Sequence, residues 1–127
     1  MLRTVLGVVA GIVAWIALVI ASDFAISAVW PAYQAAKPNM SFDLAMMLAR
    51  LTESTVALVI AAWIASRAAP ASRQAGWGLG IVLLLCFIPI HYGLWNKFPV
   101  WYHAYFLASL VAVPSIVATV GRETAAA

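Results

Sequence analysis

Hydrophobic residues in this chain form four long runs separated by short polar stretches. A helix that crosses the hydrocarbon core of a bilayer needs about 20 predominantly apolar residues. Each run reaches that length, so the pattern predicts four membrane-spanning helices. We expect them at about residues 5–30, 42–66, 75–95 and 99–120.

Polar residues and prolines predict where these helices end. Pro31 ends the first helix, and a polar stretch leads to Ser41, the expected N-cap of the second helix, with Asp43 in its first turn. The stretch RAAPASRQ predicts an aqueous loop after the second helix. The short link NKFP makes the last two helices an antiparallel hairpin, with Pro99 in the first turn of the fourth.

Composition agrees with this pattern. Of 127 residues, 66% are hydrophobic and 9% charged, and the mean hydropathy is +1.03. The sequence therefore predicts an all-α integral membrane protein, a four-helix transmembrane bundle that forms a single domain over residues 1–127. The net charge of +3 is scattered and forms no basic patch, which argues against a nucleic acid partner. Cys86 is the only cysteine and lies in an apolar run, so we expect a buried, inert thiol.

Basic residues predict the orientation, because cytoplasmic loops are enriched in Lys and Arg. Four arginines fall on one side of the predicted bundle and two lysines on the other: Arg3, Arg67, Arg73 and Arg122 against Lys37 and Lys97. Both termini are therefore expected in the cytoplasm of a bacterium, with the chain crossing the inner membrane several times. The first span is expected to be a retained helix and not a cleaved signal peptide, because its apolar run is longer than the apolar core of a signal peptide.

Aromatic residues gather near both predicted membrane boundaries. Those near the outer boundary are Trp30, Tyr33, Phe42, Trp95, Phe98 and Trp101, and those near the inner one are Trp63 and Trp77. Tryptophan and tyrosine are enriched at membrane interfaces, so we expect these residues to be interface anchors.

Three charged residues lie inside the predicted spans. Asp23 and Arg50 share a depth in the outer half, and Glu53 shares a helix face with Arg50. Charges at this depth are unfavourable and usually face the bundle interior and pair. We expect a buried charged cluster of net charge minus one. It is either a polar site or an ion-pair network that only fixes the helices.

Two histidines, His91 and His103, are expected near the same outer boundary, with Tyr92, Tyr102 and Tyr105 around them. The helical position of His91 predicts that it faces into the bundle. These residues are candidates for a proton, metal or ligand site, and the alternative is that the histidines are interface residues hydrogen-bonded to water. A metal would be zinc or copper with an added carboxylate. No cofactor is otherwise expected.

Small residues predict where the helices pack tightly. Gly7 with Gly11, and Gly76 with Gly80, each form a GxxxG pattern on the cytoplasmic side. We expect the inner half of the bundle to be tight and the outer half to be held apart by larger polar side chains.

The segment FPVWYHAYFL, residues 98–107, followed by Pro114, resembles the last helix of a group of small four-helix bacterial inner-membrane proteins. The activity of that group is uncharacterised, so the resemblance implies a membrane fold and no function. Length and span count also resemble the small multidrug-resistance transporters, but their essential glutamate is in the first helix. Here the first helix offers Asp23, and Glu53 is in the second.

Three function classes therefore stay open. The first is a non-catalytic accessory or assembly protein, in which the charged cluster fixes the bundle or meets a partner helix. The second is a small proton- or ion-coupled transporter or channel unit, which with so few helices would act as an oligomer. The third is a metal or redox protein using His91 and His103. The bilayer is the expected surrounding, with a homo-oligomer or a larger membrane complex as the expected assembly.

Overall fold

The computed structural model describes residues 1–69 and 73–126, with side chains for 1–69 and 74–121. Every regular element in this part of the chain is helical: α1 (Leu2–Val29), α2 (Pro31–Ala36), the 3₁₀ helix η1 (Lys37–Asn39), α3 (Leu44–Ala68), α4 (Arg73–Gly93) and α5 (Val100–Ala126). α1, α3, α4 and α5 are long and apolar enough to cross a membrane. The predicted fold, an all-α four-helix transmembrane bundle, is confirmed.

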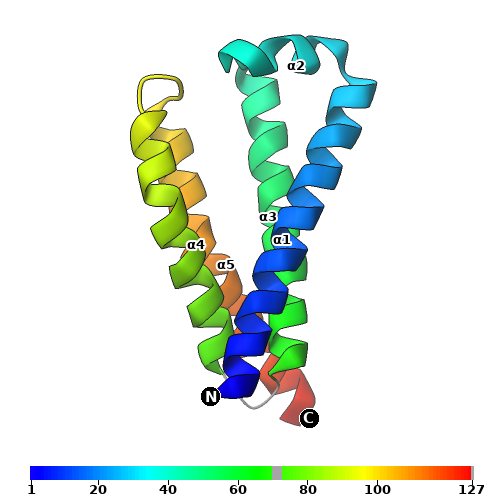
Figure 1. The fold of residues 1–127 in the computed structure, drawn as a ribbon, viewed down its shortest axis with the longest axis vertical. Helices are drawn as coiled ribbons and strands as arrows, with labels where there is room; N and C mark the ends of the chain where they lie inside the picture. The colour runs from blue at the N-terminus through cyan, green and yellow to red at the C-terminus, as the bar shows by residue number, and fades with distance from the viewer. Residues whose placement is uncertain (70–72, 127) are drawn as a thin grey trace.

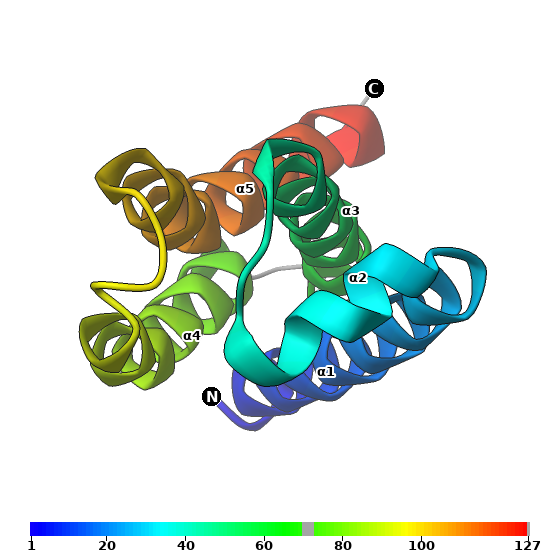
Figure 2. The same cartoon turned by 90° about the horizontal axis from the view of Figure 1, so that it is seen from above.

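The four long helices form two pairs, α1 with α3 and α4 with α5 (Figure 1). Both termini lie at one end of the bundle, where the pairs come together. Toward the other end the pairs diverge, and α2 and the α4–α5 connection lie there (Figure 1). Viewed from above, α2 and the segment after it cross over the α1–α3 side of this wide end (Figure 2).

Glycines let the helices approach closely at the narrow end. A Cβ atom added at Gly7 of α1 would lie 2.8 Å from the Ala65 carbonyl oxygen of α3. One added at Gly80 of α4 would lie 2.7 Å from the Leu110 carbonyl oxygen of α5. Gly76 faces α5 at a similar distance, and Gly11 is slightly less tight against α3 and α4. At Gly7, Gly76 and Gly80, no larger residue fits without moving the helix backbones apart.

Two helix ends differ from the prediction. The N-cap of α3 is Asp43, whose carboxylate accepts a hydrogen bond of 2.8 Å from the Met46 backbone N–H. Ser41 lies too early in the chain to make this contact, so its expected capping role is wrong. Pro99 precedes the first residue of α5, and its carbonyl oxygen accepts a bond of 3.0 Å from the Tyr102 N–H.

The polar stretch after α1 contains helical structure that the sequence did not predict. Pro31 both ends α1 and starts α2, because proline suits the first turn of a helix. η1 follows directly, and Met40 then takes a left-handed backbone conformation with φ of 52°. Of the predicted RAAPASRQ loop, residues 70–72 lie outside the described residues.

Three side-chain environments also differ from the prediction. Tyr33 is 0% exposed and Phe98 is 8% exposed, so neither is an interface anchor. The fold of α2 back over the bundle places Tyr33 against Phe42, with ring centroids 5.3 Å apart. Phe98 stacks on Tyr102 at 4.5 Å. Cys86, expected to be buried, is exposed on the surface of α4.

Candidate functional site

An ion pair joins α1 to α3 at the wide end of the bundle. Arg50 Nη1 lies 3.6 Å from Asp23 Oδ1, and both side chains are about a third exposed or less. Tyr33 of α2 connects the same two groups: its hydroxyl accepts a bond of 2.7 Å from Arg50 and donates one of 2.8 Å to Asp23. Three helices therefore meet at the Asp23 carboxylate.

Lys37 of η1 completes this network. Its ammonium group pairs with Asp23 Oδ2 and donates a hydrogen bond of 3.1 Å to Ser27 Oγ. The predicted trio of Asp23, Arg50 and Glu53 has a formal charge of minus one, and Lys37 adds the positive charge that balances it. The sequence assigned Lys37 to a loop, because no periodic pattern indicates that α2 and η1 fold back onto α1.

The hydroxyl of Tyr33 is held in its neutral form. Burial, and next the hydrogen bond that it donates to Asp23, raise the pKa of Tyr33 to about 12. Tyr33 therefore acts as a neutral bridge between the carboxylate and the guanidinium.

Glu53 lies apart from this ion pair. Its carboxylate accepts a hydrogen bond of 2.8 Å from Ser22 Oγ of α1. Within the described residues, no Lys or Arg nitrogen lies within ion-pairing distance of Glu53. The predicted trio of Asp23, Arg50 and Glu53 is thus brought to one region, but only two of its members pair directly.

The two histidines face each other rather than the membrane interface. His91 Nδ1 of α4 and His103 Nδ1 of α5 lie 2.7 Å apart, and the side chains are 6% and 1% exposed. His91 also stacks on Phe106 at 4.5 Å, and His103 on Trp95 at 4.8 Å. The alternative of interface residues bonded to water does not fit this buried pair.

Of the three tyrosines expected around the histidines, Tyr102 lies closest to the charged network. Its ring stacks on His91 at 6.3 Å, and its hydroxyl accepts a bond of 3.4 Å from Arg50 Nε. Tyr105 shares a hydrogen bond of 3.1 Å with Thr55 at an exposed site, and Tyr92 is 83% exposed. Tyr102 therefore links the charged network to the histidine pair.

The histidine pair offers a poor set of metal ligands. Among the described residues, no three His, Cys, Asp or Glu side chains lie close enough to hold one ion. Zinc and copper sites in proteins usually use three or four protein ligands. The two imidazoles instead bond directly to each other through their Nδ1 atoms.

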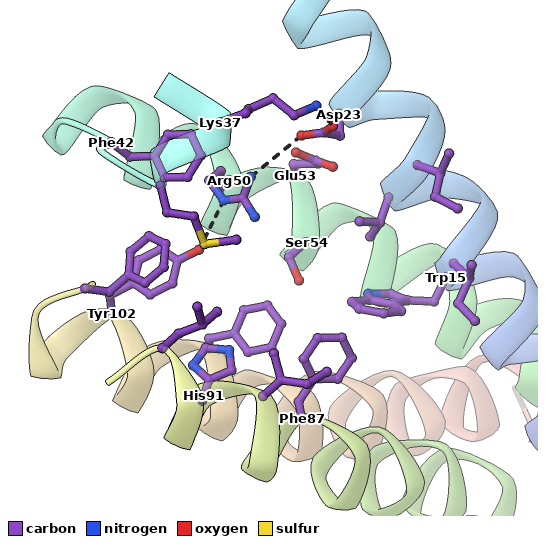
Figure 3. A pocket seen from close by; sticks show the side chains of 18 residues that line it. Trp15, Asp23, Lys37, Phe42, Arg50, Glu53, Ser54, Phe87, His91 and Tyr102 are labelled. Carbon is purple, nitrogen blue, oxygen red and sulfur yellow. Dashed lines mark hydrogen bonds and ion pairs between the residues drawn. The ribbon is translucent and has the colours of Figure 1, made fainter. Parts of the chain in front are cut away.

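A cavity of about 530 Å³ lies between the two helix pairs (Figure 3). One end is polar and is formed by Asp23, Lys37, Arg50 and Glu53. The rest of the wall is largely apolar and rich in aromatic rings, which are those of Trp15, Phe42, Phe87, His91, Phe98, Tyr102 and Phe106. The cavity is therefore amphipathic.

Two polar groups on the apolar part of the wall have no partner. Ser54 Oγ and Trp15 Nε1 are both buried and make no hydrogen bond, although both residues line the cavity. Sequence reasoning missed both residues, because a serine and a tryptophan are unremarkable within apolar helices.

No family model, curated protein or solved structure matches this chain. The functional proposal therefore rests on the geometry of the site.

Proposed function

We propose that this chain is a small, non-catalytic multi-pass protein of a bacterial inner membrane that binds an apolar or amphipathic molecule in the cavity between its helix pairs. The observation that supports this most is the cavity itself. Its volume of about 530 Å³ falls within the range of about 300–1,000 Å³ typical of small-molecule sites. Such sites are mostly apolar with a few placed polar groups, as this one is.

The charged network supports a structural role beside the cavity. Asp23, Arg50 and Lys37 pair with one another and together carry one net positive charge, which the carboxylate of Glu53 balances nearby. Because pairing reduces the cost of placing charges in a membrane, these contacts can hold α1, α3 and η1 in place while the cavity stays open.

The narrow end of the bundle favours binding over conduction through one chain. Ala61, Ala65 and Leu79 are 0% exposed there, and Gly7 and Gly80 bring the helices into direct backbone contact. The packed helices of the narrow end therefore block the passage of a molecule that enters at the wide end. With both termini in the cytoplasm, as the arginines and lysines favour, the cavity lies in the outer half of the membrane.

This proposal can be tested by filling the cavity. Val19 of α1 is partly buried and lines it, whereas Val13 of the same helix is 61% exposed and does not. The protein would be extracted in a mild detergent, and bound small molecules would be identified by mass spectrometry. Wild type and Val13→Phe should each retain the same molecule, and Val19→Phe should lose it while keeping its helical content. Equal retention by both variants, or no bound molecule in the wild type, would contradict the proposal.

Glu53 favours a second candidate function, proton-coupled movement of the bound molecule. It lines the cavity and lacks a paired cation within the described residues, so its carboxyl group is available to exchange a proton. In a weakly buffered solution, ligand binding by wild type should then take up or release protons, as measured with an indicator dye. Glu53→Gln should abolish that change while binding persists. Identical proton exchange by Glu53→Gln would remove this candidate.

A further inference from the structure

We propose that the cavity selects a molecule with a carbonyl oxygen on an apolar body, because its wall presents unpaired hydrogen-bond donors and no unpaired cation. This inference rests on the proposed binding function and names the class of ligand. Quinones and the glycerol esters of lipids share this chemistry and are both present in bacterial membranes.

The hydroxyl of Ser54 is the first of these donors. Serine and threonine within helices often bond to a carbonyl one turn earlier, as Ser115 does to Val111 at 2.6 Å and Thr55 to Leu51 at 2.7 Å. Ser54 makes no such bond, although it is only 6% exposed. Figure 3 shows its hydroxyl pointing away from α3 toward α4. A buried hydroxyl without a partner is costly, and an acceptor from a ligand would satisfy it.

The indole of Trp15 supplies the second donor. Its ring is 5% exposed and meets Phe87 edge to face at 5.2 Å. Its Nε1 has no hydrogen-bond partner. Indole nitrogen only donates, so the group that satisfies it must be an acceptor. A ligand that bears an ammonium or other pure donor would leave this nitrogen unpaired.

The histidine pair supplies the third donor. One Nδ1 must donate to the other across their 2.7 Å contact, and the accepting histidine then carries its proton on Nε2. His103 Nε2 is buried without a partner. Buried N–H groups without a partner are rarer than buried acceptors without one, so His103 Nε2 is better assigned as an unprotonated acceptor. The proton of His103 is then on Nδ1, which donates to His91 Nδ1. His91, which lines the cavity, then presents an Nε2–H.

Both cations at the polar end of the cavity are already paired. This argues against a ligand that is recognised mainly by an anionic headgroup. Lys37 and Arg50 both pair with Asp23, and Arg50 also bonds Tyr33 and Tyr102. Phe87 and Phe106, whose centroids lie 5.2 Å apart, form an aromatic wall for the apolar body of the ligand.

The test compares three probes in dodecyl maltoside micelles, a detergent without carbonyl groups. They are a benzoquinone with a decyl chain, a short-chain diacylglycerol, and decylbenzene, which has a similar apolar body and no acceptor. At least one carbonyl probe should bind wild type about tenfold or more tightly than decylbenzene. The probe that binds identifies the source as quinone or ester.

Two conservative variants then test the donors. Ser54→Ala removes one donor with little change of shape, whereas Trp15→Phe removes the indole N–H together with one ring, and each should raise the dissociation constant of the carbonyl probe about 2- to 10-fold. Ser54→Ala should raise the dissociation constant of the carbonyl probe more than that of decylbenzene. Decylbenzene binding as tight as that of both carbonyl probes, or carbonyl binding unchanged in both variants, overturns the inference while the cavity still binds. If no probe binds wild type more tightly than Val19→Phe, the proposed function fails as well. Ser54→Ala alone decides the donor question if Trp15→Phe does not fold.

Discussion

Asp23 of α1 lies between two cations that come from different parts of the chain, with Arg50 3.6 Å away and Lys37 paired to its second oxygen. This arrangement differs from a simple ion pair, because one carboxylate pairs with two cations, one through each of its oxygens. The three side chains hold α3 and η1 against α1 at the wide end of the bundle.

Removal of Asp23 should therefore destabilise the protein more than removal of either cation. Asp23→Asn leaves Arg50 and Lys37 uncompensated, whereas Arg50→Gln leaves Asp23 paired with Lys37. We expect a loss in the free energy of unfolding of about 1–3 kcal/mol for Asp23→Asn, below the cost of about 3–5 kcal/mol for breaking a fully buried pair. Arg50→Gln should cost less, and the double variant should recover part of the loss. Additive effects, measured by denaturant unfolding in micelles, would mean that no energetic coupling exists.

Gly80 should not tolerate even a methyl group. A Cβ there would lie 2.7 Å from the Leu110 carbonyl oxygen, so Gly80→Ala must push α4 from α5 and should cost about 1–3 kcal/mol of stability. Gly93, at the end of the same helix, has nothing within 4 Å of an added Cβ and provides the matched control. Thermal unfolding should separate the two variants. Equal melting temperatures would show that the narrow end is not tightly packed.

Tyr33 should give the protein a distinct loss of stability at high pH. In the unfolded chain its hydroxyl loses a proton near pH 10.0, whereas the pKa in the folded protein is about 12. Stability from neutral Tyr33 is complete below pH 10 and is lost as the pH rises through about 12. Tyrosinate absorbance should show one late titration step that Tyr33→Phe removes and Tyr92→Phe, at an exposed site, leaves unchanged. A late step that persists in Tyr33→Phe would contradict the assignment.

Orientation can be measured by cysteine labelling in a Cys86→Ser background. η1 and the α4–α5 connection lie at the wide end, and the C-terminal end of α3 lies at the narrow end. Asn39, Lys97 and Arg67 belong to these three segments in turn, and all three are exposed. Cysteines at the first two positions should react with an impermeant thiol reagent in intact cells, and a cysteine at Arg67 should react only after lysis. The reverse result would place the cavity in the cytoplasmic leaflet.

The helical fold was predictable because apolar runs of bilayer length leave few alternatives to spanning helices. The depth of Asp23 and Arg50 followed from the regular rise of a helix, and their ion pair agrees with it. The inward orientation of His91 was also predictable from its position along the helix, and His91 lines the cavity.

The missed features depend on how the chain turns between helices. Lys37 and Tyr33 enter the charged network only because α2 and η1 fold back toward α1, and no hydrophobic period encodes that turn. The cavity was missed for a similar reason. It results from the divergence of two helix pairs, whereas sequence patterns describe one helix at a time.

If the space beside Trp15 holds a small molecule, the indole N–H signals of the protein should report its binding. The chain has six tryptophans, so a nitrogen-labelled sample in dodecyl maltoside should give six indole signals, with that of Trp15 assigned from Trp15→Phe. Addition of the carbonyl probe that binds should shift the Trp15 signal and leave those of Trp63 and Trp77, exposed and outside the cavity, in place. A Trp15 signal that stays fixed at saturating probe, or equal shifts at all six tryptophans, would contradict binding beside Trp15.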